Sequence, residues 1–383
     1  MVLGIVAMCA AAGFPATVPL VVTNDDNPAA GGNTASVYHL NTNTGAMTLI
    51  KVLATGGSGL GSGYFANTGT AVESNAHCVF VANTGSDTIS WFEGPSYVLG
   101  GSAGIPGMFS TFGLGGSIAL SHNGRFLASG NSGTMNVSTW AVATNCALTL
   151  VGSYVPSIGP DYFSPLGFTP DNHSLVVPAP NLSGAEIFKV HTNGTLLDVN
   201  NVTWPAAACT GGCYPTGLDF TNNSGVVVFG NASLGQTSVL TANIAASTLS
   251  SPLIFNIANV AGTLNPNVPY FSQAGAAGNG ELFVGMSGAP FSTGEVTTNF
   301  TSIPTIAVSG LGNAVTTGSG YMGAIRTYGA TGVGAGGMMV MAVYPNILQP
   351  AKIGAGGVIT LLAPTIDVNG VGLLSISIYP ATR

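Results

Sequence analysis

Residues 215–257 read PTGLDFTNNSGVVVFGNASLGQTSVLTANIAASTLSSPLIFNI, and this stretch decides the fold. It divides into short apolar or alternating segments at residues 215–221, 225–230, 237–243 and 251–257, with turns rich in Asn, Gly, Ser and Ala between them. Short segments of alternating polarity, separated by turn residues, are typical of β-strands. The stretch therefore predicts a unit of four antiparallel strands.

The unit recurs along the chain. In the clearest copies the second strand ends at a turn asparagine, namely Asn24, Asn83, Asn131, Asn181 and Asn231. These asparagines are separated by 59, 48, 50 and 50 residues, and weaker copies follow at residues 281–287 and 337–346. A repeat of this length is typical of propeller blades. We therefore expect an all-β fold, a seven-bladed β-propeller of four-stranded antiparallel blades, as a single domain over residues 17–383.

The two ends of the repeat array are incomplete in complementary ways. Residues 18–24 (VPLVVTN) match the second strand of a unit, with no first strand before them. Residues 372–380 (GLLSISIYP) match a first strand with nothing after it. The C-terminal strand is therefore expected to complete the first blade and close the ring, which removes an exposed sheet edge.

The composition excludes several classes of protein. Charged residues make up 5% of the chain and hydrophobic residues 46%, whereas ordinary soluble domains carry about 25% charged residues. Such a chain is not disordered. Its basic residues occur singly, so no nucleic-acid partner is expected, and no apolar stretch is long enough to predict a transmembrane span. No cofactor and no metal site are predicted.

The first residues resemble a secretory signal. Residues 1–16 (MVLGIVAMCAAAGFPA) have its apolar core and small-residue end, although a basic start is missing. The alternatives are an ordinary first segment or a true start codon farther upstream. Export would place the protein outside the cell or at the cell surface.

The cysteine count is compatible with export. If Cys9 is lost with the signal or left free, four cysteines remain, and they allow three pairings. We favour Cys209 with Cys213, which closes a small loop, and Cys78 with Cys146, which joins neighbouring blades. Metal binding by the CxxxC pair is the alternative, but no second ligand pair lies nearby in the sequence.

The sequence contains eight candidate N-glycosylation sites of the Asn-x-Ser/Thr type. They are Asn136, Asn172, Asn181, Asn193, Asn201, Asn222, Asn231 and Asn299. A chain this rich in Asn, Ser and Thr produces several such triplets by chance, so their number alone does not demonstrate glycans.

Four phrases carry a family resemblance. They are HLNTNTGAMTLI (39–50), CVFVANTGSDTISWFE (78–93), LSHNGRFLASGN (120–131) and NPNVPYFSQAGAAGNGELFVG (265–285). They resemble the lactonase family of seven-bladed propellers, which includes 6-phosphogluconolactonase-like and 3-carboxymuconate cyclase-like proteins and overlaps surface propellers with YVTN-type repeats. The resemblance covers about residues 17–380 and implies an enzyme acting on a small anionic lactone at the mouth of the hub.

The charged groups that such an enzyme needs are scarce in this chain. Arg326 is the one arginine expected on an inner strand, and it is the candidate anion contact. Asp25, Asp26 and Asp161 are expected near the same face. The pair Asp25–Asp26 could serve acid–base chemistry or hold Ca²⁺, or it could simply form a turn before Asn27-Pro28.

Aromatic residues recur immediately before or at the start of inner strands. Together with Asp161, they are the ligand-binding candidates: Tyr64, Phe65, Tyr162, Phe163, Tyr214, Tyr270, Phe271 and Tyr321. In a ring they would converge on one rim as a collar suited to flat, weakly charged ligands such as neutral glycans. Alternatively, they pack between blades.

Two functions therefore compete. The scarcity of charged groups favours a secreted, non-catalytic propeller that acts as a surface or structural component, associates with other copies of itself, or binds neutral glycans. The family phrases favour a lactonase-like or muconate-cyclase-like enzyme.

Overall fold

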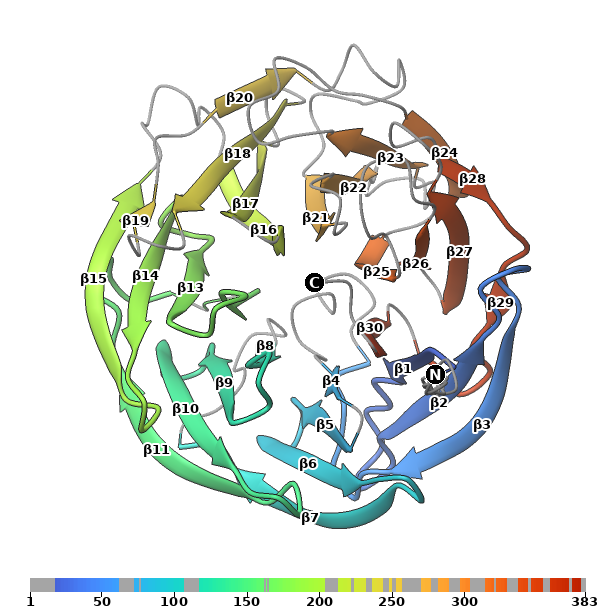
Figure 1. The fold of residues 1–383 in the computed structure, drawn as a ribbon, viewed down its shortest axis with the longest axis horizontal. Coiled ribbons are helices and arrows are strands. Elements are labelled where there is room, and N and C mark those ends of the chain that lie inside the picture. The colour runs from blue at the N-terminus through green and yellow to red at the C-terminus, as the bar shows by residue number, and fades with distance from the viewer. Residues whose placement is uncertain are drawn as a thin grey trace, which may run out of the picture.

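The computed structural model describes residues 18–203 except 62–71, 76, 107–116, 162 and 164. Beyond residue 203 it describes the strands given below and residues 346, 362–364, 367–371 and 374. The described residues form β-strands and no helix, so none of them makes a helix that could cross a membrane. Figure 1 shows the sheets arranged around a common centre.

Four sheets contain most of the residues whose side chains are described. The first has the strand order β3 (Met47–Ala54), β2 (Thr34–Leu40), β1 (Leu20–Asn24), β30 (Ser375–Tyr379). The next is β4 (Val72–Ser74), β5 (Cys78–Asn83), β6 (Thr88–Glu93), β7 (Val98–Gly104). It is followed by β8 (Ser117–Leu120), β9 (Phe126–Asn131), β10 (Asn136–Val142), β11 (Leu148–Tyr154), and by β12 (Gly167–Phe168), β13 (Ser174–Ala179), β14 (Gly184–Val190), β15 (Leu196–Thr203).

The remaining strands form sheets of the same antiparallel kind. One contains β16 (Cys213–Thr221), β17 (Ser224–Asn231), β18 (Gln236–Asn243), β19 (Thr248–Leu249), with β20 (Leu253–Asn256) also paired to β18. Another contains β21 (Tyr270–Ala276), β22 (Leu282–Gly288), β23 (Thr297–Ile303), β24 (Ala314–Ser319). The last contains β25 (Met322–Tyr328), β26 (Gly337–Val343), β27 (Ile347–Ile353), β28 (Ile359–Leu361), with β29 (Thr365–Ile366) also paired to β27.

The two ends of the strand array meet. β30 pairs antiparallel with β1, with Leu20 opposite Tyr379 and Asn24 opposite Ser375. Leu374, Ile376 and Ile378 are buried in a core that also contains Val21 from β1 and Val340 from β26. β30 is therefore held by main-chain hydrogen bonds and by apolar packing.

The hydrophobic core lies between neighbouring sheets. One cluster joins the sheet of β1 to that of β5, a second joins the sheets of β5 and β9, and a third joins those of β9 and β13. Strands that are covered on both faces need a continuous apolar run rather than alternation. This is why CVFVAN (β5) and SLVVPA (β13) are buried along their whole length.

The repeated asparagine stabilises the turn after the second strand. Asn83 Nδ2 donates to Ser90 Oγ at 2.8 Å, and Asn131 Nδ2 donates to Ser138 Oγ at 2.9 Å, in each case across to the next strand. Asn24 Nδ2 instead donates to the carbonyl of Ala82 in the neighbouring sheet, at 2.8 Å. The marker of the repeat thus makes hydrogen bonds that a hydrophobic residue could not make.

A disulfide joins Cys78 on β5 to Cys146 in the turn between β10 and β11. It links two neighbouring sheets, as the pairing from the sequence predicts. Cys209 lies outside the described residues, and for Cys213 the strand is described but not the side chain.

Candidate functional site

The most concentrated group of described polar side chains lies at the end of β1. We call it the Asp25–Asp367 cluster; its members are Thr23, Asp25, Thr34, Ser36, Tyr38, Asp367 and Asn369. Asp25 and Asp367 are both fully buried. Thr23 Oγ1 lies 2.6 Å from Asp25 Oδ1 and 2.8 Å from Asp367 Oδ2, so it bridges the two carboxyl groups.

The count of hydrogen-bond donors and acceptors around Thr23 favours a proton on one of the two carboxyl groups. The hydroxyl of Thr23 has one hydrogen and can donate to only one of the two carboxyl oxygens. It also accepts from the backbone N–H of Ser36 at 3.2 Å. The second carboxyl oxygen can be bonded to Thr23 only if that carboxyl group is itself protonated and donates. The geometry therefore favours a protonated carboxyl group beside Thr23.

The electrostatics agree with this accounting. Burial, followed by repulsion from Asp367, raises the pKa of Asp25 from 3.8 to about 7. The hydroxyls of Thr34 and Ser36, which donate to Asp25 Oδ2 at 2.6 and 2.9 Å, oppose this rise. Burial and the neighbouring Asp367 also raise the pKa of Tyr38 well above its usual value.

The cluster joins the first strands to the segment that precedes the closing strand. The backbone N–H of Val371 donates to the carbonyl of Asp25 at 2.8 Å, and Asn369 Nδ2 donates to Ser36 Oγ at 3.1 Å. Because both carboxyl groups are buried, neither can reach a dissolved substrate. The cluster therefore has a structural role: its hydrogen bonds hold β1 and β2 against residues 367–371.

Asp26 also belongs to a turn. It has a φ of 56°, and its Oδ1 accepts the backbone N–H of Leu60 at 2.6 Å. A side chain at Gly59 would lie 2.4 Å from the Asp26 backbone, so glycine is needed for this close approach. Of the two readings of Asp25–Asp26, the structure favours the turn over an open carboxylate pair.

Two of the ligand-binding candidates, Phe163 and Asp161, lie inside the protein rather than on an exposed rim, and a ligand-binding role for them stays a prediction. Phe163 is 0% exposed and belongs to the core between the sheets of β9 and β13. Asp161 is also buried, and its carboxylate accepts Asn181 Nδ2 and the backbone N–H of Leu182, both at 3.0 Å. Apolar packing and turn stabilisation account for the burial of these two residues.

The other collar candidates are not tested. Tyr64, Phe65, Tyr162 and Tyr321 lie outside the described residues. Tyr214 lies on β16, and Tyr270 and Phe271 lie on β21, where the strands but not these side chains are described. Among the sequons, Asn222 lies outside the described residues, and only the strands of Asn231 and Asn299 are described.

Arg326 lies on β25, the first strand in its sheet and the one nearest the centre in Figure 1. It is half-buried and stands opposite Val340 of β26. Tyr328, two residues later on the same strand, lines a depression of about 460 Å³ at the end of β1 opposite to the Asp25–Asp367 cluster.

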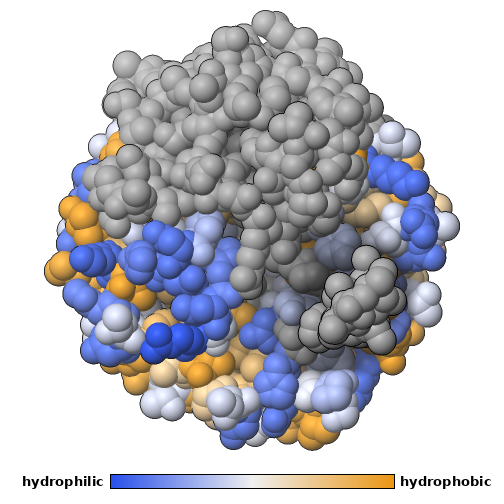
Figure 2. Space-filling model, in the orientation of Figure 1, coloured by the Kyte–Doolittle hydropathy of each residue, from blue (hydrophilic) through white to orange (hydrophobic). Residues whose placement is uncertain are grey.

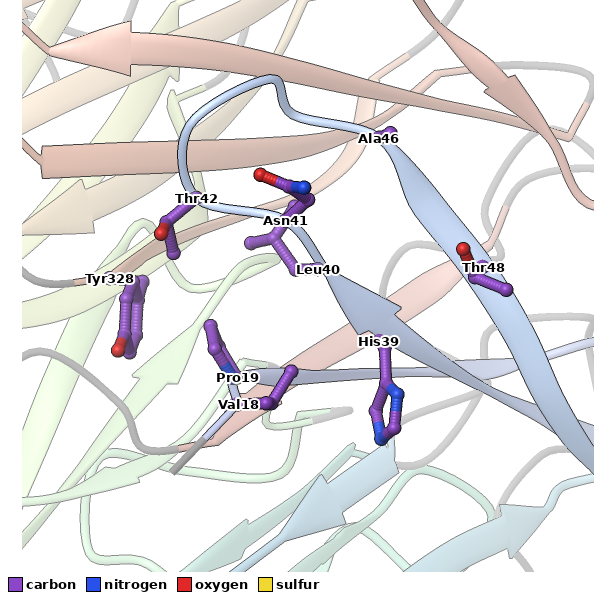
Figure 3. A pocket seen from close by; sticks show the side chains of 9 residues that line it. All are labelled: Val18, Pro19, His39, Leu40, Asn41, Thr42, Ala46, Thr48 and Tyr328. Carbon is purple, nitrogen blue, oxygen red and sulfur yellow. The ribbon is translucent and has the colours of Figure 1, made fainter. Parts of the chain in front are cut away.

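That depression mixes apolar and neutral polar groups. Figure 3 shows Tyr328 and His39 on either side of Val18 and Pro19. The other lining residues are Leu40, Asn41, Thr42, Ala46 and Thr48. An apolar floor with a few hydrogen-bonding groups suits a small neutral ligand.

One buried acid was missed by reasoning from the sequence. Glu186 on β14 is fully buried, and its Oε2 accepts the backbone N–H of Ile158 at 2.7 Å. Burial raises its pKa. A signal existed, because Glu186 follows the end of β13 by the same seven positions that separate Ser90 and Ser138 from the ends of β5 and β9.

Asp367 was also missed. It is the last acid in the chain, and no other follows Glu295. A single acid in so uncharged a segment indicates a specific structural or functional role, but the sequence does not show which side chain it contacts.

The outermost strands expose apolar side chains. Val98 on β7 is 61% exposed and Leu197 on β15 is 52% exposed. The others on these edge strands are Leu49, Ile50, Val52, Leu99, Leu150 and Val199. Strands β3, β7, β11 and β15 carry only two charged residues, Lys51 and Asp198. Figure 2 shows hydrophobic patches interspersed along the described edge of the molecule.

Comparisons with known proteins identify the class of fold. No family model matches the sequence, and no curated protein matches it. Among solved structures, a Lactobacillus plantarum protein is 15% identical with a TM-score of 0.64, covering 94% of this chain and 99% of its own. A candidate 6-phosphogluconolactonase from Bacteroides fragilis is 11% identical with a TM-score of 0.60, covering 95% and 100%. The periplasmic gluconolactonase of Pseudomonas aeruginosa is 15% identical with a TM-score of 0.55, covering 80% and 84%. At such identities the likeness shows a β-propeller fold, and no activity.

Proposed function

We propose that this chain is a seven-bladed propeller, closed by β30, that works outside the cell as a non-catalytic, self-associating module. The sheet orders and the pairing of β30 with β1 support the ring. The Cys78–Cys146 disulfide supports an oxidising location, because disulfides are rare in reducing compartments.

The observation that carries the proposal is the apolar, nearly uncharged rim of β3, β7, β11 and β15. Exposed edge strands usually carry charged residues, which prevent pairing with other chains. Here the edge offers main-chain hydrogen-bonding groups and apolar side chains together. We expect copies of the chain to associate rim to rim.

The test is the mass of the full chain in solution as a function of concentration, by sedimentation. Val98→Lys with Leu197→Lys should weaken association by about tenfold or more, because each lysine would be desolvated at the contact. Asn43→Lys, in the exposed turn between β2 and β3, adds one lysine outside the four rim strands and is the control for charge alone. A wild-type chain that stays monomeric would refute the proposal.

A second candidate is a lactonase-like enzyme, favoured by the fold of the structural neighbours and by Arg326 on an inner strand. We expect no measurable hydrolysis of sugar lactones by the wild-type chain. If hydrolysis occurs and Arg326→Ala lowers it by ten- to a hundredfold, the worth of a charge-assisted hydrogen bond of about 1.5–3 kcal/mol, the enzymatic function replaces ours.

A third candidate is weak binding of neutral glycans in the depression beside Tyr328, where a sugar ring could stack on the phenol. Calorimetric titration with neutral oligosaccharides tests it. Tyr328→Ala should abolish the heat of binding while Asn43→Ala leaves it unchanged; equal heats from both variants would exclude this site.

A further inference from the structure

The described glycosylation sequons differ sharply in their folded geometry. Asn193, in the sequence Asn193-Gly194-Thr195, lies in the exposed turn between β14 and β15. Its Oδ1 accepts the hydroxyl of Thr195 at 2.8 Å and the backbone N–H of Thr195 at 3.2 Å. Its Nδ2 donates to none of the described residues. The sequon hydroxyl thus contacts the amide oxygen, while the amide nitrogen stays accessible.

The turn that carries Asn193 is held firmly from the neighbouring sheet. Thr139 Oγ1 donates to the carbonyl of Gly194 at 2.9 Å, and Arg125 Nη2 donates to the carbonyl of Thr192 at 3.2 Å. Gly194 has a φ of 86°, and a side chain there would meet the ring of Phe126 at 2.5 Å. These contacts use the backbone of the turn and leave the side chain of Asn193 exposed.

Two other sequons bury the hydroxyl that defines them. Ser138, the hydroxyl residue of the Asn136 sequon, and Ser174, that of Asn172, are both fully buried. The amide of Asn136 accepts Asn131 Nδ2 at 2.6 Å, and the amide of Asn172 accepts the backbone N–H of Asn123 at 3.1 Å. In the folded chain neither hydroxyl is accessible, and Asn172 Nδ2 also donates to the carbonyl of Pro170 at 3.3 Å.

Two more sequons use the nitrogen that would carry the sugar. Asn181 Nδ2 donates to the buried carboxylate of Asp161 at 3.0 Å, and Asn201 Nδ2 donates to Ser157 Oγ at 3.0 Å. A sugar on Asn181 would crowd its hydrogen bond to Asp161, and a sugar on Asn201 would sit on edge strand β15. Of the five described sequons, Asn193 is the one whose hydroxyl residue is not buried and whose amide nitrogen donates to none of the described residues.

We propose that Asn193 is an N-glycan acceptor of this protein, an inference that rests on the extracellular role proposed above. In the transfer, the amide nitrogen of Asn193 forms a bond to the anomeric carbon of a lipid diphosphate-linked oligosaccharide. The bond from that carbon to the diphosphate breaks, the lipid diphosphate leaves, and the amide loses one proton to a base of the transferase. The folded turn accommodates the product because the modified nitrogen has no hydrogen-bond partner among the residues that the structure describes.

The experiment expresses the full chain behind a cleavable eukaryotic leader and maps glycopeptides of the secreted, folded protein by mass spectrometry. We expect the Asn193 peptide to carry a glycan that an amidase removes, leaving aspartate. Asn193→Gln and Thr195→Val should each abolish occupancy there, and Thr195→Ser, which keeps the hydroxyl, should retain it. Asn172→Gln is the matched control and should not change the Asn193 peptide.

A folded wild-type protein with an unmodified Asn193 would overturn the inference, whatever the state of the other sequons. Sedimentation of the same folded protein separates this result from the proposed function. If the chain stays monomeric while Asn193 is glycosylated, the proposed function fails and the acceptor geometry stands.

Discussion

At the residue scale, the role of an acid in this protein depends on its partners rather than on its type. Asp25 and Asp161 belong to the few charged residues of the chain, and both are buried and bonded to neighbouring hydroxyl, amide or N–H groups. Thr23 is as important as either carboxyl group of the Asp25–Asp367 cluster, since its hydroxyl contacts both. A buried polar network is stable when every donor and acceptor is paired.

The shared proton makes stability depend on pH at this residue. The folded-state pKa of Asp25 is raised from 3.8 to about 7, so the folded state binds more protons than the unfolded state between these values. The free energy of unfolding should therefore fall as the pH rises through this window, by at most about 4 kcal/mol, and level off above it.

Asp25→Asn removes the titrating group and keeps a group of similar shape. We expect the variant to lose most of this pH dependence, measured by urea unfolding at about pH 5 and about pH 8. Asp87→Asn, at a half-buried acid in the turn between β5 and β6, should leave the dependence intact. A wild-type chain more stable at the higher pH would contradict the sign argued here.

At the element scale, β30 carries more of the fold than its length suggests. Its residues pair with β1 along five positions and contribute Ile376 and Ile378 to the core shared with β26 and β27. The Asp25–Asp367 cluster holds the segment just before it. The pairing with β1, the shared apolar core and the Asp25–Asp367 cluster therefore all help to hold β30 in place.

Deleting residues 372–383 should abolish cooperative unfolding, because β1 would lose a neighbour and the core its aliphatic side chains. Ile376→Ala is the milder test and should lower the free energy of unfolding by about 2–5 kcal/mol. Thermal and urea melts measure both. A truncated chain that melts as sharply as the full chain would show that β30 is dispensable.

At the scale of the whole molecule, stability comes from packing between neighbouring sheets. The Cys78–Cys146 disulfide adds a covalent link between two of them, closing a sequence separation of 68 residues. A disulfide between residues so far apart in the sequence lowers the conformational entropy of the unfolded chain substantially.

Replacing both cysteines by alanine should lower the free energy of unfolding by about 2–5 kcal/mol. Urea unfolding of the oxidised wild type and of the double variant measures this, and reduction of the wild type should approach the same value. Equal stability in all three samples would mean that the link does not constrain the unfolded chain.

The strands, their grouping into units and the place of the C-terminal strand beside β1 could be predicted from the sequence, because alternation and turn residues act over a few neighbouring positions. The sequence allowed three pairings of four cysteines and favoured Cys78 with Cys146, which the structure confirms. Only the tertiary structure decided that Thr23 would meet Asp367, 344 positions away, and that Phe163 would be buried between two sheets instead of lining a rim. The physical reason is that the pKa, exposure and partners of a side chain depend on groups from other sheets, and a local pattern does not specify which groups these are.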